Sequence, residues 1–138
     1  MVNKQLGNAL ERKVCNFLYC MGYWSHNFVQ GPAGQPADII AVRNYHAYLI
    51  DAKVCSNSTF PLTRREANQI TAMDLWEKCG NGSGWFACEL PDGEVYMLSA
   101  TRIKRYFDEG KKTLNEKDIR EGVRIRKWAE SCGQSFQR

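Results

Sequence analysis

One segment carries the strongest structural signal in the chain: Pro36-Ala-Asp38-Ile-Ile-Ala-Val-Arg-Asn-Tyr-His-Ala-Tyr-Leu-Ile-Asp51-Ala-Lys53. Its two apolar runs, 39–42 and 47–50, are separated by a short polar turn, which predicts two adjacent antiparallel strands. Asp38 precedes the first run, and Asp51 and Lys53 follow the second, so these side chains should meet at one edge of the sheet. Because strand side chains alternate, Asp51 and Lys53 should share a face while Ala52 points away.

Two carboxylates beside an ammonium suit a divalent metal ion and a phosphate. A phosphodiester is anionic and repels hydroxide, whereas Mg²⁺ or Mn²⁺ offsets that charge and lowers the pKa of a bound water. Asp38 and Asp51 can supply carboxylate ligands and the Ala52 backbone carbonyl a further oxygen, while Lys53 can neutralise the phosphate or orient the attacking water. The alternative is that both acids are ordinary strand-end residues and Lys53 is a solvated partner.

Two helices bring further polar side chains toward this site. Residues 3–21 have apolar side chains at helical spacing, and Glu11 lies on the edge of that stripe. It is either an exposed helix acid or an additional metal ligand. A capping box, Thr63-Arg-Arg-Glu66, predicts a helix that runs to about residue 79. The apolar side chains expected on its buried face are Ala72, Met73, Leu75, Trp76 and Cys79.

Gln69 falls inside that expected apolar face, where an amide needs a hydrogen-bonding partner. It is either a buried structural amide or a group that contacts the attacking water or the substrate. The remaining patterns predict a strand over 23–29, a loop over 30–36, a hairpin of strands 85–90 and 94–98, and helices over 100–107 and 115–121. This order predicts an α/β fold, a mixed β-sheet flanked by helices.

The bulk composition is that of a soluble globular protein. The chain has 138 residues, 43% apolar and 25% charged, which predicts a single domain over residues 1–128 and a polar, frayed tail over 129–138. No segment approaches the ~20 consecutive apolar residues of a membrane span. No signal-peptide pattern begins the sequence, so we expect a cytoplasmic protein with no membrane association.

The six cysteines have no metal-binding spacing. No pair stands in a Cys-x-x-Cys arrangement, and the two histidines are far apart. We therefore expect reduced structural thiols rather than disulfides or a zinc site.

The net charge of +4 permits nucleic-acid binding without requiring it. The candidate DNA contacts are Arg12, His26, Arg64 and Arg65. Each also has a simpler interpretation, the arginines as solvated helix residues and His26 as an ordinary strand histidine or a proton donor near the site.

The motifs resemble the PD-(D/E)xK nuclease superfamily, and within it two groups of Holliday junction resolvases. The opening helix, with its Glu11-Arg12 pair and closing Gly22-Tyr23, is similar to that of archaeal-type (Hjc-like) resolvases. Residues 50–62, ending in Thr-Phe-Pro-Leu, followed by Gln69 and by segments 97–106 and 119–125, resemble the RecU resolvases of Gram-positive bacteria and their phages. The resemblance implies a restriction-endonuclease-like fold.

The same resemblance implies a function. Asp38 and Asp51 would be the metal-binding acids, Lys53 the catalytic lysine, and Glu11 and Gln69 further members of the site. The protein would be a Mg²⁺-dependent endonuclease, acting as a homodimer that nicks opposed strands of a four-way DNA junction. A compact enzyme encoded by a phage or mobile element, working in the host cytoplasm, fits this pattern.

Three features depart from these relatives. Asp51 stands where the resolvases usually have Glu, and Ser25-His26-Asn27 replaces an expected arginine. The long stalk that RecU proteins insert before the first acid is reduced to residues 30–36. Two alternatives therefore stay open, a repair or restriction-like nuclease of the same fold and a DNA-binding module without catalysis.

Overall fold

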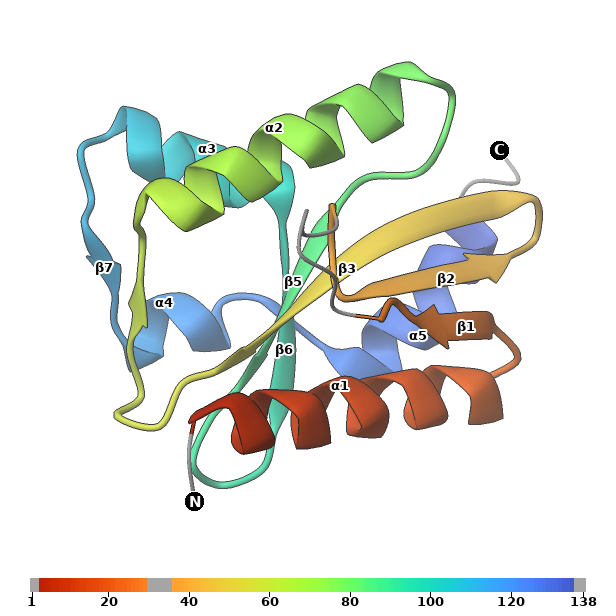
Figure 1. Cartoon of the computed structure of the whole chain (residues 1–138), viewed down its shortest axis with the longest axis horizontal. Helices are drawn as coiled ribbons and strands as arrows, with labels where there is room; N and C mark the ends of the chain where they lie inside the picture. Colours follow the sequence, from red (N-terminus) through yellow and green to blue (C-terminus); the bar gives the residue numbers. More distant parts are fainter. Residues whose placement is uncertain (1–2, 30–35, 136–138) are drawn as a thin grey trace.

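The computed structural model describes residues 3–29 and 36–135 (Figure 1). The helices are α1 (Asn3–Cys20), α2 (Arg64–Lys78), α3 (Ala100–Asp108), α4 (Glu116–Arg120) and α5 (Ile125–Ser135). The strands are β1 (Trp24–Asn27), β2 (Ile39–Arg43), β3 (His46–Val54), β4 (Phe60–Pro61), β5 (Trp85–Glu89), β6 (Val95–Ser99), β7 (Thr113–Leu114) and β8 (Val123–Arg124). A six-stranded sheet has the order β1-β2-β3-β5-β6-β8, and β4 and β7 form a separate two-stranded sheet.

The predicted β2–β3 hairpin is confirmed. Ile39 pairs with Ile50, and the strands turn at Asn44 and Tyr45, which have φ of 52° and 67°. Positive φ at both central residues is typical of the two-residue turn that matches strand twist. β3 then continues to Val54, beyond the first residue of β2, and pairs in parallel with β5. The other described neighbours in this sheet are antiparallel, so the mixed α/β sheet is as expected.

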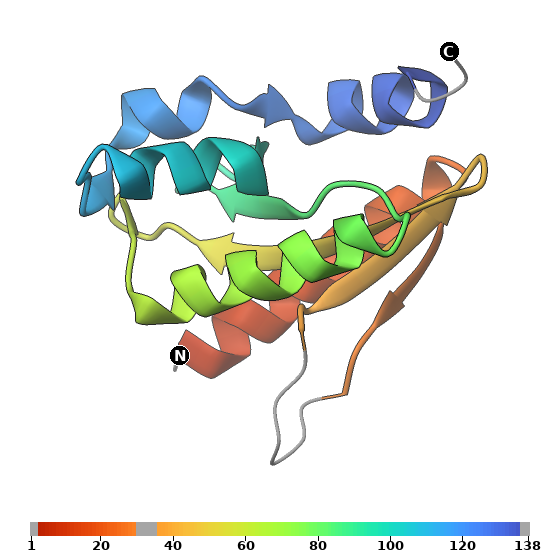
Figure 2. The same ribbon diagram turned by 90° about the horizontal axis from the view of Figure 1, so that it is seen from above.

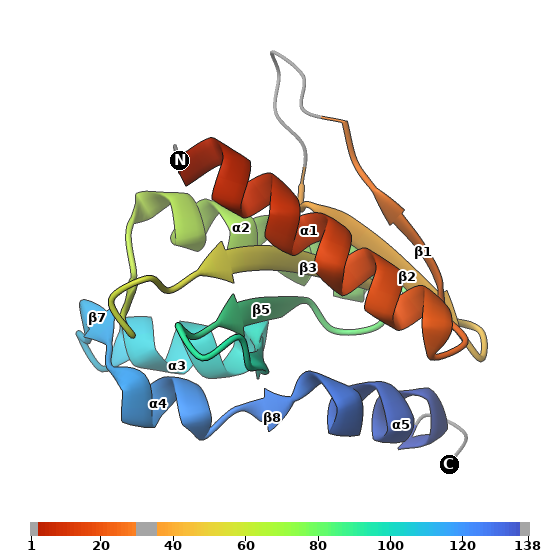
Figure 3. The same cartoon turned by 90° about the horizontal axis from the view of Figure 1, so that it is seen from below.

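Helices cover both faces of the sheet. On one face α1 lies across β1, β2 and β3, and its Leu10 and Val14 share a hydrophobic cluster with Ile50 (Figure 3). On the opposite face α2 and α3 pack over β3 and β5, where Leu49 and Phe86 belong to a second cluster (Figure 2). Neighbouring residues of β3 alternate between the two clusters, so apolar side chains fill both faces of the strand. A polar site can form only at the end of β3.

The expected frayed tail from residue 129 is wrong as far as Ser135, because α5 occupies this region. Trp128 is only 2% exposed, and its ring packs against those of Tyr23, Tyr48 and Trp85 at centroid distances of 5.4–5.7 Å. The helix has a short apolar stripe, Ile125, Trp128, Ala129 and Cys132, that the surrounding polar residues obscure in the sequence. Residues 136–138 of the predicted tail lie outside the described residues.

Other expectations have mixed outcomes. The short strands β4, β7 and β8 were not predicted, because two-residue pairs such as Phe60 with Leu114 have no periodicity to read.

All six cysteines are free thiols, as expected. The predicted loop over 30–36 lies outside the described residues except for Pro36. Among the described helices, none has the length and apolar character needed to cross a bilayer.

Candidate active site

The site forms where β2 and β3 separate. The Asp38 backbone N–H donates to the Ile50 carbonyl at 3.2 Å, and beyond that point no strand among the described residues pairs with β3 on this side. The Ala52 N–H donates instead to Asp38 Oδ2 at 2.8 Å. Because the N–H and C=O of one strand residue point to the same side, the Ala52 carbonyl faces Asp38 as well. The backbone thus places two kinds of oxygen ligand at one edge.

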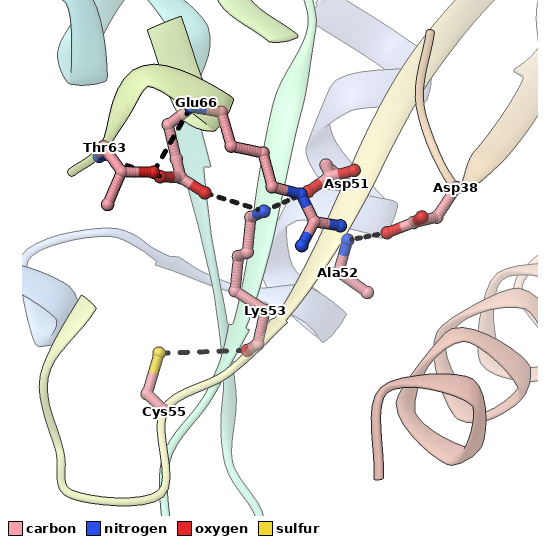
Figure 4. A network of polar contacts seen from close by, with 8 residues as sticks. Asp38, Asp51, Ala52, Lys53, Cys55, Thr63 and Glu66 are labelled. Atoms are coloured by element: carbon pink, nitrogen blue, oxygen red, sulfur yellow. Dashed lines mark hydrogen bonds and ion pairs between the residues drawn. The ribbon is translucent and has the colours of Figure 1, made fainter. Parts of the chain in front are cut away.

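The ammonium of Lys53 lies between two carboxylates. Its Nζ is 2.8 Å from Asp51 Oδ2 and 3.0 Å from Glu66 Oε2 (Figure 4). The Lys53 side chain is 12% exposed and the two acids are less exposed still, so this is a largely buried ionic group. Asp51 and Lys53 share a strand face, as predicted, and α2 brings Glu66 to them across that face.

Asp51 Oδ2 lies 2.8 Å from the Lys53 ammonium in an ion pair. Within the described part of the chain this buried oxygen accepts no hydrogen bond beyond that ion pair. A buried carboxylate with so few hydrogen bonds would gain from a further electrostatic partner. A hard cation at the Asp38–Asp51 edge would supply one.

A cavity of about 710 Å³ opens beside these acids. Its walls come from the start of α1, the end of β3, the loop before β4 and the first turn of α2. The polar and charged residues that line it include Asn8, Glu11, Asp38, Lys53, Asn57 and Arg65. Asp51 is 1% exposed and lies beneath this surface. The cavity volume is large enough for a phosphate group beside Asp38, which lines it.

Electrostatics at the site disfavour three neighbouring negative charges. Burial, followed by the Asp51 charge, raises the pKa of Asp38 to about 8, against the Ala52 N–H bond that lowers it. Burial and Asp51 also raise the pKa of Glu11, while Arg12 and Arg65 oppose that rise. Across residues 3–29 and 36–135, no three His, Cys, Asp or Glu side chains converge into a complete metal site. Asp38, Asp51 and the Ala52 carbonyl therefore form the best set for a cation, with Glu11 beside them.

Residues 37–130 match the family model described as Recombination protein U, or RecU. The chain belongs to the RecU family. This is a family of Holliday junction resolvases, as the sequence motifs indicated. Comparison with curated proteins found no sequence match.

A solved structure shows the fold independently. The Holliday junction resolvase Hjc of the archaeal hyperthermophile Archaeoglobus fulgidus superposes with a TM-score of 0.69 at 18% identity. The match covers 90% of this chain and 95% of Hjc. This RecU-family chain therefore has the resolvase fold.

The remaining predicted residues divide into two groups. Arg65 lines the cavity, whereas Arg12 and Arg64 are exposed outside its lining. His26 lies on β1 with its ring stacked on that of Trp24 at 6.0 Å, also outside the lining. Gln69 is half-buried outside the lining, and among the described residues its Oε1 has no hydrogen-bond donor. Their roles in DNA contact or catalysis remain predictions.

Glu66 is the residue that sequence reasoning missed. It appeared there as part of a helix cap, and the cap is confirmed: the Thr63 N–H donates to Glu66 Oε1 at 2.8 Å. The predicted apolar face of this helix is confirmed for Met73, which is buried, and for Trp76, which packs against the core, but it is wrong for Leu75, which is 64% exposed, and for Cys79. The residues that the helix buries are Glu66, Ile70 and Met73. The i, i+4, i+7 spacing of these three residues was the available signal.

Proposed function

We propose that this RecU-family resolvase hydrolyses phosphodiester bonds in opposed strands of four-way DNA junctions with the help of Mg²⁺. Asp38, Asp51 and the Ala52 carbonyl would hold the ion, and Mn²⁺ could replace it. The observation that carries this proposal is the gathering of Asp38, Asp51 and Lys53 at the end of β3, where the buried Asp51 Oδ2 accepts no hydrogen bond from the described residues beyond its ion pair with Lys53. When bound, the ion would offset phosphate charge and lower the pKa of the attacking water.

The protein residues would divide the remaining work. Lys53 would stabilise negative charge on the scissile phosphate or orient the water, because its ammonium lies at the cavity wall beside Asp51. Glu11 would act as a further acid on the α1 side of the same cavity. Gln69 would donate or accept a hydrogen bond near the reacting groups, which would give its unsatisfied oxygen a partner.

We further infer a homodimer in the cytoplasm as the working form. A four-way junction has approximate two-fold symmetry, and a symmetric dimer would place one site on each of two opposed strands. Arg65 at the cavity, with Arg12, His26 and Arg64 on nearby surfaces, would contact the junction arms. A mass measurement in solution, with and without junction DNA, tests the dimer.

A cleavage assay tests the function. The protein is incubated with a four-way junction and with linear duplex of the same sequence, each with Mg²⁺ or with EDTA. Metal-dependent nicking of the junction in preference to the duplex is expected. Equal cleavage of both substrates would indicate a repair or restriction-like nuclease, and junction binding without cleavage would indicate a non-catalytic module.

Two variants test the site within that assay. Asp38→Asn and Lys53→Ala should lower the junction cleavage rate by about 10³-fold or more, because each removes a group that acts on the reacting phosphate. Junction affinity measured in EDTA should change little. Cleavage at a wild-type rate by either variant would contradict the assignment.

A further inference from the structure

Lys53 and a divalent ion would compete for the same carboxylate. The Lys53 ammonium sits 2.8 Å from Asp51 Oδ2, the oxygen that otherwise has no donor among the described residues. A cation bound through this oxygen would compete with the ammonium at that place. Because the Lys53 side chain is only 12% exposed, water could not fully solvate the displaced charge.

Glu66 offers the ammonium a second place to bind. Its Oε2 is 3.0 Å from Lys53 Nζ, on the side away from Asp38 (Figure 4). Its other oxygen, Oε1, accepts the Thr63 backbone N–H at 2.8 Å in the capping box of α2. The helix cap therefore holds the Glu66 carboxylate in place, and the carboxylate can hold Lys53 without moving.

We propose that Glu66 is a positioning residue that retains the Lys53 ammonium when Asp51 takes up a divalent cation. Glu66 thereby strengthens cation binding and keeps Lys53 at the cavity wall, where a phosphate would arrive. This inference rests on the proposed metal-dependent function, but it concerns Glu66, which is neither a proposed ligand of the ion nor a proposed contact of the substrate. It gives the capping box of α2 a second role beyond starting the helix.

The test measures Mn²⁺ affinity in the full chain by titration calorimetry without DNA. Glu66→Gln keeps an oxygen acceptor for the Thr63 N–H but removes the charge that holds Lys53. The variant should bind Mn²⁺ about 10-fold more weakly than wild type, the size of one lost charge-assisted hydrogen bond. Thr63→Ala is the matched control: it removes the hydroxyl that caps the helix and donates to Glu66 Oε1, but it keeps the backbone N–H that donates to the same oxygen. Glu66 should stay beside Lys53, so Mn²⁺ affinity should remain within about 2-fold of wild type.

A second background separates positioning from simple charge. In Lys53→Met protein there is no ammonium to retain, so adding Glu66→Gln should change Mn²⁺ affinity by less than about 2-fold. The double variant should also bind Mn²⁺ at least as tightly as wild type, a rescue that a misfolded helix could not show.

Several outcomes would overturn the inference. One is equal Mn²⁺ affinity in Glu66→Gln and wild type, and another is a Glu66→Gln effect that persists undiminished in Lys53→Met. Loss of affinity in Thr63→Ala equal to that in Glu66→Gln would show that the helix start alone matters. If wild type itself failed to bind Mn²⁺, the proposed metal site would fall as well, which distinguishes the two failures.

Discussion

At the scale of single residues, the site places like charges together and leaves some buried polar atoms short of hydrogen bonds. Burial and the charge of Asp51 raise the pKa of Asp38. Within the described part of the chain, Gln69 Oε1 has no hydrogen-bond donor and Asp51 Oδ2 accepts no hydrogen bond beyond its ion pair with Lys53. Such groups lower stability and persist where function requires them. Stability measurements can therefore detect the site without an activity assay.

Asp38→Asn should change how stability depends on pH. With its pKa raised from 3.8 to about 8, Asp38 favours the folded state when protonated, and that contribution is lost as pH rises through 8. Without metal, the unfolding free energy of the variant relative to that of wild type should therefore be ~2–3 kcal/mol higher at pH 9 than at pH 4. Urea unfolding in EDTA at both pH values measures this. A difference that is independent of pH would contradict the coupling, and Mg²⁺ should stabilise wild type more than the variant.

Gln69→Met should separate stability from activity. Removing a buried oxygen without a donor should raise the unfolding free energy by about 1 kcal/mol. Cleavage of the junction should fall by about 10-fold or more if the amide contacts the reacting groups. Denaturant unfolding and single-turnover kinetics provide the two measurements. A destabilised variant with full activity would show instead that Gln69 is a structural amide.

At the scale of elements, α2 contributes residues to the site, whereas α5 contributes to the hydrophobic core. The first turn of α2 carries Glu66 to Lys53 and Arg65 to the cavity, so the helix start belongs to the site. Helix α5 lies on the opposite face of the sheet, where Trp128 fills the space between the rings of Tyr23, Tyr48 and Trp85. The C-terminal helix is thus part of the hydrophobic core rather than an appendage.

Trp128→Ala should be strongly destabilising. Truncating a fully buried aromatic side chain typically costs about 3–5 kcal/mol through lost burial and the cavity left behind. Thermal and denaturant unfolding measure the loss. Lys127→Ala, at an exposed neighbouring position, is the control and should stay within about 0.5 kcal/mol of wild type. A small effect at Trp128 would revive the expectation of a frayed C-terminus.

At the scale of the whole molecule, a chain with net charge +4 must bring a polyanion to a cavity whose described lining includes the acids Glu11 and Asp38. Cations at the cavity rim can offset that repulsion, and Arg65 is the arginine among its described lining residues. Phosphate contacts release counterions, so their number sets the salt dependence of binding.

Arg65→Ala should weaken junction binding and reduce the slope of log affinity against log salt by about 1, since one phosphate contact is lost. Arg64→Ala, exposed on the adjacent position but outside the cavity lining, is the matched comparison and should reduce the slope less. Fluorescence anisotropy in EDTA over a range of salt concentrations measures both. Equal slopes in wild type and Arg65→Ala would exclude a phosphate contact at this residue.

The sequence by itself determined the hairpin and its acids. Strand alternation, a two-residue turn and the position of charges at the strand ends are local properties, so Asp38, Asp51 and Lys53 could be placed together from spacing alone. The edge position of Glu11 followed in the same way from helical periodicity. The RecU resemblance was likewise carried by short segments, residues 50–62, Gln69, 97–106 and 119–125.

Only the tertiary structure decided how helices rotate against the sheet. That rotation brings Glu66 to Lys53, exposes Leu75 and leaves Gln69 without a donor among the described residues. It also packs Trp128 of α5 against three aromatic rings from distant segments of the chain. Such contacts join residues far apart in the chain, and their energies depend on packing geometry that local propensity does not contain.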